Sequence, residues 1–134
     1  MKISRKNLII LIVIIVLFLS LILGIVYLKR VANYKQAVKE TTFDNINISD
    51  VSDGVYIGEY DVDFIYVKVE VTVENGKITN INILEHKNGR GKSAEVIVSE
   101  IISEQKIDVD AISSATNSST TIKKAVENAL QKGL

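Results

Sequence analysis

One long apolar run near the N-terminus constrains this chain more than any other feature. The 21 residues from Leu8 to Leu28 are apolar except for Ser20 and Gly24. A helix that rises 1.5 Å per residue would extend about 31 Å over this run, which matches the hydrocarbon core of a bilayer. Basic residues flank the run on both sides, and Tyr27 falls near one interface. The run therefore predicts a single transmembrane helix over residues 8–28.

A cleaved signal peptide is the alternative interpretation of this run. The apolar stretch is longer than that of a usual signal peptide, and no small-x-small cleavage site follows it. An uncleaved anchor is therefore favoured. Basic residues on both sides leave the orientation open by charge alone. Because the segment before the run is short, we expect residues 1–7 to stay in the cytoplasm. The chain would then be a single-pass protein of the cell membrane with an extracytoplasmic C-terminal domain.

The charge of the chain is divided between two parts of opposite sign. Residues 1–40 contain seven Lys or Arg and one acid, whereas residues 41–134 contain nine Lys or Arg and fifteen acids, so the parts carry +6 and −6. A basic N-terminal part suits the surface of a lipid bilayer, and an acidic domain argues against nucleic-acid binding. The chain has no cysteine, which excludes disulfides, thiolate metal sites and iron–sulfur clusters.

Between the apolar run and the domain, residues 29–52 are expected to form a juxtamembrane stalk. Apolar residues fall at helical spacing over residues 31–43 and predict a continuation of the anchor helix. Residues 45–52 are polar and short, and they are expected to mark the boundary. The domain itself is assigned to residues 53–134.

Alternating side chains in the first half of the domain predict three antiparallel strands. The expected strands are Gly54–Tyr60, Phe64–Val73 and Lys77–Glu85. Asn75-Gly76, between the second and third strands, is a strong hairpin signal. The alternation slips over residues 79–81, which predicts a β-bulge.

The second half of the domain predicts helices. Residues 88–91, Asn-Gly-Arg-Gly, break the sheet pattern, and residues 93–104 have helical periodicity. The short segment Ile107–Ile112 fits a further strand. Ser118 or Ser119 is expected to cap a last helix. The predicted fold is α+β: a small antiparallel sheet with two or three helices on one face, preceded by one transmembrane helix. The residues expected to face inward from the last helix are Ile122, Ala125, Val126, Ala129 and Leu130.

A hydroxyl-rich stretch lies at the predicted start of the last helix. Seven of the ten residues from Ser113 to Ile122 carry a hydroxyl, and the residues from Ser113 to Ser119 are all small or short. The first N–H groups of a helix lack intrahelical partners, and the helix dipole is positive there, so such a start suits a phosphate. A plain polar loop with a serine cap is the alternative.

The order of these elements and several short stretches resemble the FMN-binding domain family. The resemblance extends from Asp53 to about Leu130. Members of that family are small extracytoplasmic domains that carry FMN, and they are related to the flavin-bearing subunits of the Na+-translocating NADH:quinone reductase and of Rnf complexes. The matching stretches are Asp53-Gly-Val-Tyr-Ile-Gly-Glu59, Val67-Lys-Val-Glu-Val-Thr-Val73, Asn75-Gly-Lys-Ile-Thr79, Ile83-Leu-Glu-His-Lys87, Asp108-Val-Asp-Ala-Ile-Ser-Ser-Ala-Thr116 and Ala125-Val-Glu-Asn-Ala-Leu130.

The resemblance also implies how FMN is held. It implies that Thr116 takes FMN through a phosphoester bond, which a separate Mg2+-dependent flavin transferase makes from FAD. Ser118 and Ser119 would be added hydrogen-bond donors to the phosphate. This chain has Ser114 where the family usually has glycine. The residues that match the attachment motif are Asp110, Ser113, Ser114, Ala115 and Thr116.

For function, the resemblance implies an electron carrier rather than a stand-alone enzyme, since the flavin carries the redox chemistry. The expected partners are the lipid bilayer, the flavin transferase and a membrane electron donor such as a quinone-linked dehydrogenase. One alternative is an FMN-dependent reductase of a small extracellular acceptor. Another is a flavin-free binding or scaffold module, for which the departure at Ser114 is the support. No catalytic residue and no metal site is predicted.

The remaining polar and aromatic candidates are interpreted as structural. His86, the only histidine, is expected at the surface at a strand end, and Arg90 and Lys92 are expected in a solvated turn. Aromatic side chains on a half-buried sheet mostly serve packing. That interpretation applies to Tyr56, Tyr60 and Tyr66, while Asp61 and Asp63 are expected to be solvated in a hairpin turn.

Overall fold

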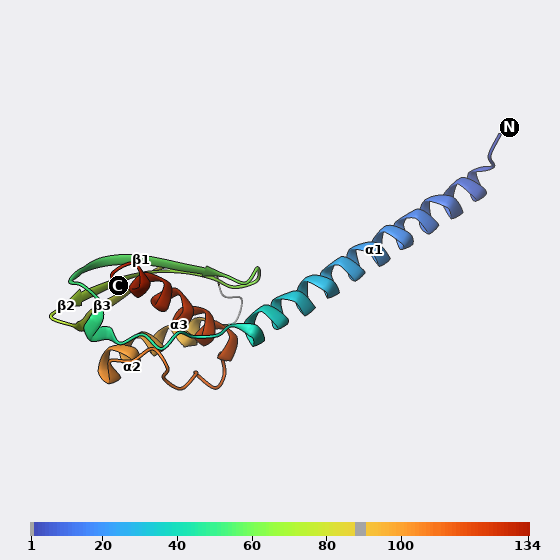
Figure 1. Ribbon diagram of the computed structural model, residues 1–134. Helices are drawn as coiled ribbons and strands as arrows, with labels where there is room; N and C mark the ends of the chain where they lie inside the picture. Colours follow the sequence, from blue (N-terminus) through green and yellow to red (C-terminus); the bar gives the residue numbers. More distant parts are fainter. Residues whose placement is uncertain (1, 88–90) are drawn as a thin grey trace. The chain divides into compact units, whose positions relative to one another are not determined.

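The computed structural model describes residues 2–87 and 91–134. The chain divides into two compact units, Met1–Lys35 and Gln36–Leu134. The first unit consists mainly of the N-terminal part of α1 (Arg5–Glu40) (Figure 1). No residue of α1 is buried, although the structure describes the whole helix. In the described chain, α1 is the one helix long and apolar enough to cross a membrane, which is consistent with a single-pass anchor.

The second unit contains the predicted sheet. Its strands are β1 (Gly54–Asp61), β2 (Tyr66–Glu74) and β3 (Lys77–Lys87), which pair antiparallel in the order β1-β2-β3 (Figure 1). Asn75 and Gly76 join β2 to β3 with φ angles of 53° and 72°. Two successive residues with positive φ are what a type I′ hairpin turn requires. The three predicted strands and the hairpin are therefore confirmed.

Two irregularities in β3 bend the pairing with β2. Thr72 is opposite Asn80 and Val73 is opposite Ile78, so Thr79 is the extra residue of a bulge. This bulge confirms the slip predicted over residues 79–81. A second register shift lies between Lys68 and Val69 and leaves Leu84 as an extra residue. Leu84 is 49% exposed, because the bulge removes it from the regular alternation of the strand.

Helices cover one face of this sheet, as predicted. A 3-10 turn, η2 (Lys92–Val96), leads into α2 (Ile97–Glu104), and α3 (Thr116–Gln131) ends the chain (Figure 1). α3 contacts β1 and β2, and α2 contacts β3. The core joins the inner face of β2 to the predicted stripe of α3, and every member is fully buried: Val67, Val69, Val71, Val73, Ile122, Ala125, Val126, Ala129 and Leu130.

The closest approach in this core is between β1 and α3. A Cβ atom at Gly58 would overlap the carbonyl oxygen of Ala125 and the backbone nitrogen of Ala129, and it would lie 2.8 Å from the Cα atom of Ala129. Only a residue without a side chain lets the strand and the helix backbone approach this closely. Gly58 therefore sets the distance between the sheet and α3.

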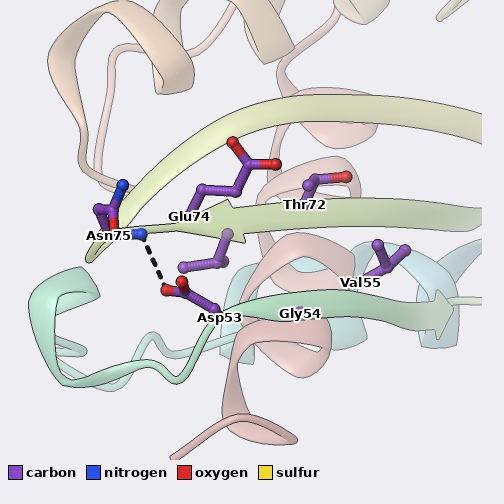
Figure 2. A pocket seen from close by; sticks show the side chains of 7 residues that line it. Asp53, Gly54, Val55, Thr72, Glu74 and Asn75 are labelled. Atoms are coloured by element: carbon purple, nitrogen blue, oxygen red, sulfur yellow. Dashed lines mark hydrogen bonds between the residues drawn. The ribbon is translucent and has the colours of Figure 1, made fainter.

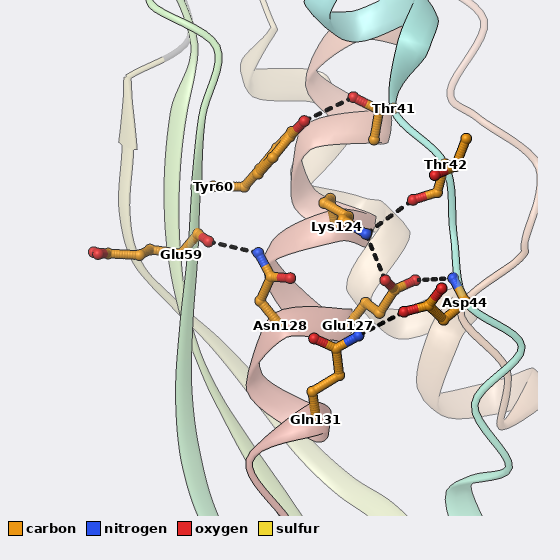
Figure 3. Close-up of polar contacts among 9 residues, drawn as sticks. All are labelled: Thr41, Thr42, Asp44, Glu59, Tyr60, Lys124, Glu127, Asn128 and Gln131. Atoms are coloured by element: carbon orange, nitrogen blue, oxygen red, sulfur yellow. Dashed lines mark hydrogen bonds and ion pairs between the residues drawn. The ribbon is translucent and has the colours of Figure 1, made fainter.

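The segment after α1 is held to α3 by polar contacts (Figure 3). Glu127 is fully buried; its Oε2 accepts a hydrogen bond from the backbone N–H of Asp44 at 3.0 Å, and its Oε1 lies 2.6 Å from Nζ of Lys124. The same Nζ donates to the carbonyl oxygen of Thr42 at 2.8 Å. A buried carboxylate is stable only when it is paired and hydrogen-bonded. These contacts fasten residues 42–44 to the domain.

The compact unit thus includes residues that the sequence assigned to the stalk. Ile48, in the 3-10 turn η1 (Ile48–Asp50), and Val51 are buried in the core. The backbone N–H of Ser52 donates to the carbonyl oxygen of Gly133 at 2.9 Å. Residues 45–52 are polar on average, but two of their three branched apolar side chains, Ile48 and Val51, are buried in the domain.

The further strand expected over Ile107–Ile112 is wrong. All of these residues are described, and they form an irregular segment in which Ile107 and Val109 are buried. The side chain of Gln105 forms two hydrogen bonds with the backbone of Ile78 in β3. It accepts from the N–H and donates to the carbonyl oxygen, both at 2.8 Å. A polar side chain therefore satisfies β3 at a position where another strand would have paired.

The predicted helix over residues 93–104 is present as two pieces, because η2 precedes α2. The break predicted over residues 88–91 falls mostly on residues 88–90, which lie outside the described residues, as does Arg90. Gly91 is described and forms the N-cap of η2.

Candidate functional site

The hydroxyl-rich stretch lies where an irregular loop enters α3. Thr116 is the first residue of α3 and is exposed, as are Asp110, Ser113 and Ser114. Ala115, at the N-cap position, is 8% exposed. The motif therefore presents its hydroxyl-bearing residues to solvent and packs its alanine inward.

The predicted serine cap of α3 is wrong. Ser118 and Ser119 lie inside the first turn and are 2% and 0% exposed, while the N-cap is Ala115, which has no polar side chain. Ser119 Oγ donates to the carbonyl oxygen of Ala115 at 2.8 Å and accepts from the backbone N–H of Ile112 at 3.0 Å. The helix begins earlier than expected, so these hydroxyls tie the loop to the helix from inside rather than cap it.

A buried lysine fixes the same loop from further along α3. Lys123 is 8% exposed, and its Nζ donates to the carbonyl oxygen of Val109 at 2.9 Å. It also lies 3.5 Å from Oδ1 of Asp108 and 5.1 Å from the centre of the Phe43 ring. The ring and the two oxygens compensate the charge that burial would otherwise penalise. Sequence periodicity did not predict that Lys123 would hold this loop, because a lysine is normally expected to be solvated.

His86 lies in the interior, and its expected surface position is wrong. Its side chain is 2% exposed; Nδ1 lies 3.2 Å from Oε1 of Glu95, and Nε2 lies 3.3 Å from Oγ of Ser118. β3, η2 and α3 supply these three residues. Glu95 and Ser118 lie nine and 32 positions after His86 in the sequence. No local pattern could have joined them.

The other polar candidates make hydrogen bonds within the domain. The phenol of Tyr56 donates to the carbonyl oxygen of Ser52 at 2.6 Å, and the hydroxyls of Tyr60 and Thr41 are 2.9 Å apart. Asp61, the last residue of β1, and Asp63, in the turn that follows, are both exposed, and Oδ1 of Asp61 accepts from the N–H of Asp63.

Tyr66, on the outer face of β2, has a perturbed acidity. Its phenol donates to Oε2 of Glu59 at 2.6 Å. That hydrogen bond, with the surrounding carboxylates, raises the pKa of Tyr66 to about 12. The interaction stabilises the neutral phenol and offers no redox or acid–base group at neutral pH.

A shallow pocket lies at the Asn75 turn, and residues far in sequence from the hydroxyl-rich loop line it. It is lined by the ends of β1 and β2, and Oδ1 of Asp53 accepts from the backbone N–H of Asn75 within it (Figure 2). None of the motif residues lines it. Among the described residues, no group of three or more acidic or histidine side chains could hold a metal ion.

The start of α3 has the donor set that an attached phosphate needs. Thr116 supplies an exposed alcohol, and the first turn of the helix, all of it described, contains no acidic residue. A helix N-terminus carries partial positive charge and directs N–H groups outward. The residues present therefore fit a phosphate ester at Thr116.

Fold and site together define a small α+β domain that presents a hydroxyl-bearing loop at a helix start. The model of the FMN-binding domain family matches residues 63–131, just over half of the chain, and the chain belongs to this family. Comparison with curated proteins and with solved structures gave no match. The matched residues run from the turn before β2 to the end of α3 and include residues 110–116. The domain is therefore a flavin-binding module whose cofactor is FMN.

Proposed function

We propose that this chain is a membrane-anchored, extracytoplasmic flavoprotein that carries FMN covalently on Thr116 for electron transfer. The family supplies the cofactor, and the position of Thr116 supports the point of attachment. Thr116 is exposed between Ala115 on one side and the buried pair Ser118 and Ser119 on the other. An alcohol held at the surface by buried neighbours is both rigid and reachable, and this is the observation on which the proposal depends.

The attachment would be made by a separate flavin transferase that uses FAD and Mg2+. A bond forms between Oγ1 of Thr116 and the phosphorus of the FMN half of FAD, and the pyrophosphate bond of FAD breaks. AMP leaves, and the hydroxyl proton passes to a base of the transferase or to solvent. Ser113, Ser114 and Ala115 have small side chains, so they leave the backbone of the loop accessible to that enzyme.

The bound flavin would supply the one-electron and two-electron redox chemistry that no side chain of this cysteine-free chain provides. Thr116 would tether the cofactor, and the first-turn N–H groups of α3 would compensate the phosphate charge. α1 would hold the domain at the membrane, where a donor such as a quinone-linked dehydrogenase could reduce it. A covalent tether prevents loss of the cofactor outside the cell.

Intact-protein mass spectrometry tests the attachment. The full chain is co-expressed with a flavin transferase, and we expect one adduct with the mass of FMN. Thr116→Ala should abolish this adduct, whereas the control Thr120→Ala, which removes a hydroxyl one turn further along α3, should keep it. An unmodified wild-type chain would instead support the flavin-free module, and an adduct that persists in Thr116→Ala would place the flavin on another residue.

Cysteine labelling tests the anchor and its orientation, because the chain has no cysteine of its own. Ser103, exposed in α2, and Lys2, before the apolar run, are each replaced by cysteine in separate chains. In intact cells, a membrane-impermeant maleimide should label Ser103→Cys and not Lys2→Cys. The reverse pattern would place the domain in the cytoplasm. Labelled chain in the soluble fraction would contradict the membrane anchor.

A further inference from the structure

A chain of hydrogen-bonding side chains joins three elements directly behind the start of α3. Glu95 of η2, His86 of β3 and Ser118 of α3 form this Glu95–His86–Ser118 chain, with separations of 3.2 Å and 3.3 Å. The side chain of His86 is 2% exposed and Ser118 is 2% exposed, whereas the side chain of Glu95 is 33% exposed. The Glu95–His86–Ser118 chain therefore runs from the surface into the interior and ends on the first turn of α3.

The chemistry of the three groups sets the direction of the two hydrogen bonds. An ionised carboxylate only accepts, so the histidine nitrogen that faces Glu95, Nδ1, carries the proton. In the neutral ring the other nitrogen, Nε2, is then an acceptor. The hydroxyl of Ser118 must donate to it, which fixes the Ser118 side chain in one orientation. A carboxylate that orients a histidine in this way is a common means of fixing both its tautomer and its ring plane.

Ser118 is the third residue of α3 and lies two positions after Thr116. Its hydroxyl is committed to His86, and the hydroxyl of the next residue, Ser119, is committed to Ala115 and Ile112. Ala115 gives the first turn no capping side chain, and these contacts hold the turn through its buried serine side chains. The start of the helix is thus held from the interior by β3 while its outer side is left open to solvent.

We propose that His86, acting through Ser118, is a positioning residue that holds Thr116 in the geometry required for transfer of FMN. This inference rests on the proposed function, because it concerns the same acceptor. His86 does not take part in the bond-forming step. It reduces the range of conformations of the first turn, so that the alcohol is presented to the transferase already oriented.

The rate of FMN transfer to the full chain in detergent micelles, with purified transferase, FAD and Mg2+, tests this role. We expect Ser118→Ala and His86→Phe to lower the transfer rate at saturating chain concentration by about tenfold or more, as expected when an acceptor loses its orientation. His86→Gln places an amide near the position of Nε2 and should restore most of the rate. Val126→Ala is the control, because it shortens a buried side chain of the same helix and leaves Ser118 untouched.

A spectroscopic test needs no flavin. His86 is the only histidine, so its ring 15N resonances are unambiguous, and they should report a protonated Nδ1 and an unprotonated Nε2 in the unmodified chain. Hydrogen exchange at the amide of Ser119, which bonds to Ala115 at 2.9 Å, should accelerate in His86→Phe and Ser118→Ala more than in Val126→Ala.

The outcomes separate the two proposals. A wild-type chain that takes no FMN overturns the proposed function and this inference with it. Normal transfer to wild type and to His86→Phe overturns the inference alone. It is also overturned if Val126→Ala slows transfer as much as His86→Phe, or if the ring carries its proton on Nε2. A slow His86→Phe with rescue by His86→Gln and a normal Val126→Ala supports it.

Discussion

α1 and α3 are both regular helices, but they treat polar and apolar side chains in opposite ways. α1 is almost wholly apolar over residues 8–28, yet none of its residues, all of them described, is buried. α3 is far more polar, yet ten of its residues are buried, and these include Ser118, Ser119, Lys123 and Glu127. The most apolar helix of the chain is thus its most exposed, and the helix with the most serine and threonine hydroxyls packs in the core of the second unit.

This contrast shows which environment each helix requires to be stable. An apolar surface on every side of a helix, with no residue buried, is favourable where the solvent is itself apolar, as in the proposed membrane anchor. A polar helix is stable in a protein core only when its polar groups have partners. In the described part of the chain, every buried side-chain nitrogen or oxygen has a hydrogen-bond partner. Equivalent substitutions in the two helices, or in the strands against α3, should therefore have unequal effects.

A pair of glycine substitutions should give the largest difference. Gly58→Ala would force a methyl group into the backbone of α3, so we expect it to destabilise the second unit by about 3 kcal/mol or more. The methyl group of Gly24→Ala in α1 would meet no described heavy atom within 4 Å, so this variant should leave the stability of the second unit unchanged. Urea unfolding of the full chain in micelles, followed by tyrosine fluorescence, measures both. Equal stabilities would show that β1 and α3 do not pack this closely.

The next largest effect should come from the buried carboxylate of α3. Glu127→Ala removes the acceptor of the Asp44 N–H and the partner of Lys124 (Figure 3). We expect a loss of about 3 kcal/mol, since one member of a buried pair is left uncompensated. The control Glu104→Ala breaks an ion pair with Lys106 whose side chains are half exposed, and it should change stability by less than about 1 kcal/mol. If the two variants lose equal stability, Glu127 is not the buried anchor of residues 42–44.

Two serines compare the helices directly. Ser119→Ala leaves the backbone N–H of Ile112 without its acceptor, and we expect it to cost about 1–2 kcal/mol. Ser20→Ala in α1 removes a bond from an exposed hydroxyl to the carbonyl oxygen of Val16, which stays bonded within the helix, and it should have almost no effect on the unfolding of the second unit. The same urea titration measures both, and a larger effect at Ser20 would reverse the comparison.

The smallest effect should appear on the open face of the sheet, opposite the face that α3 covers. Glu59→Gln removes the charged acceptor of Tyr66, so the pKa of Tyr66 should fall from about 12 toward 10.0. Because the raised pKa belongs to the folded state, the stability it contributes is present below pH 10 and is lost as the pH rises toward 12. Ultraviolet difference titration measures the shift, with Tyr66→Phe to assign the signal among the five tyrosines. An unchanged titration would show that Glu59 does not hold the phenol.

Much of the fold could be predicted because it depends on neighbouring residues. Alternation identified the strands, Asn75-Gly76 the hairpin, and the slip at Thr79 the bulge. The inward stripe of α3 followed from helical periodicity. The segment Ile107–Ile112 was mistaken for a strand because it also alternates, with Ile107 and Val109 inward. Alternation does not create a pairing partner, and the side chain of Gln105 had already satisfied Ile78.

The candidate site was predicted in part. Its family and the position of Thr116 near a helix start were predicted from the sequence, since motif and helix signals are local. Three features were not predicted: the burial of His86, the partners of Ser118 and Ser119, and the role of Lys123 behind the loop. Each of these depends on residues from other elements, and a lone histidine, serine or lysine has the same local signature whether it is solvated or buried.

By itself, the sequence determined a long apolar helix, a three-stranded sheet with its hairpin, and an alcohol near the start of the last helix. These depend on composition, on periods of two and 3.6 residues, and on residues adjacent in the chain. Only the tertiary structure decided that Thr116 is exposed while Ser118, Ser119 and His86 behind it are buried. The physical reason is that burial follows from which elements pack together, and polar groups that this packing brings together from distant parts of the sequence must satisfy one another.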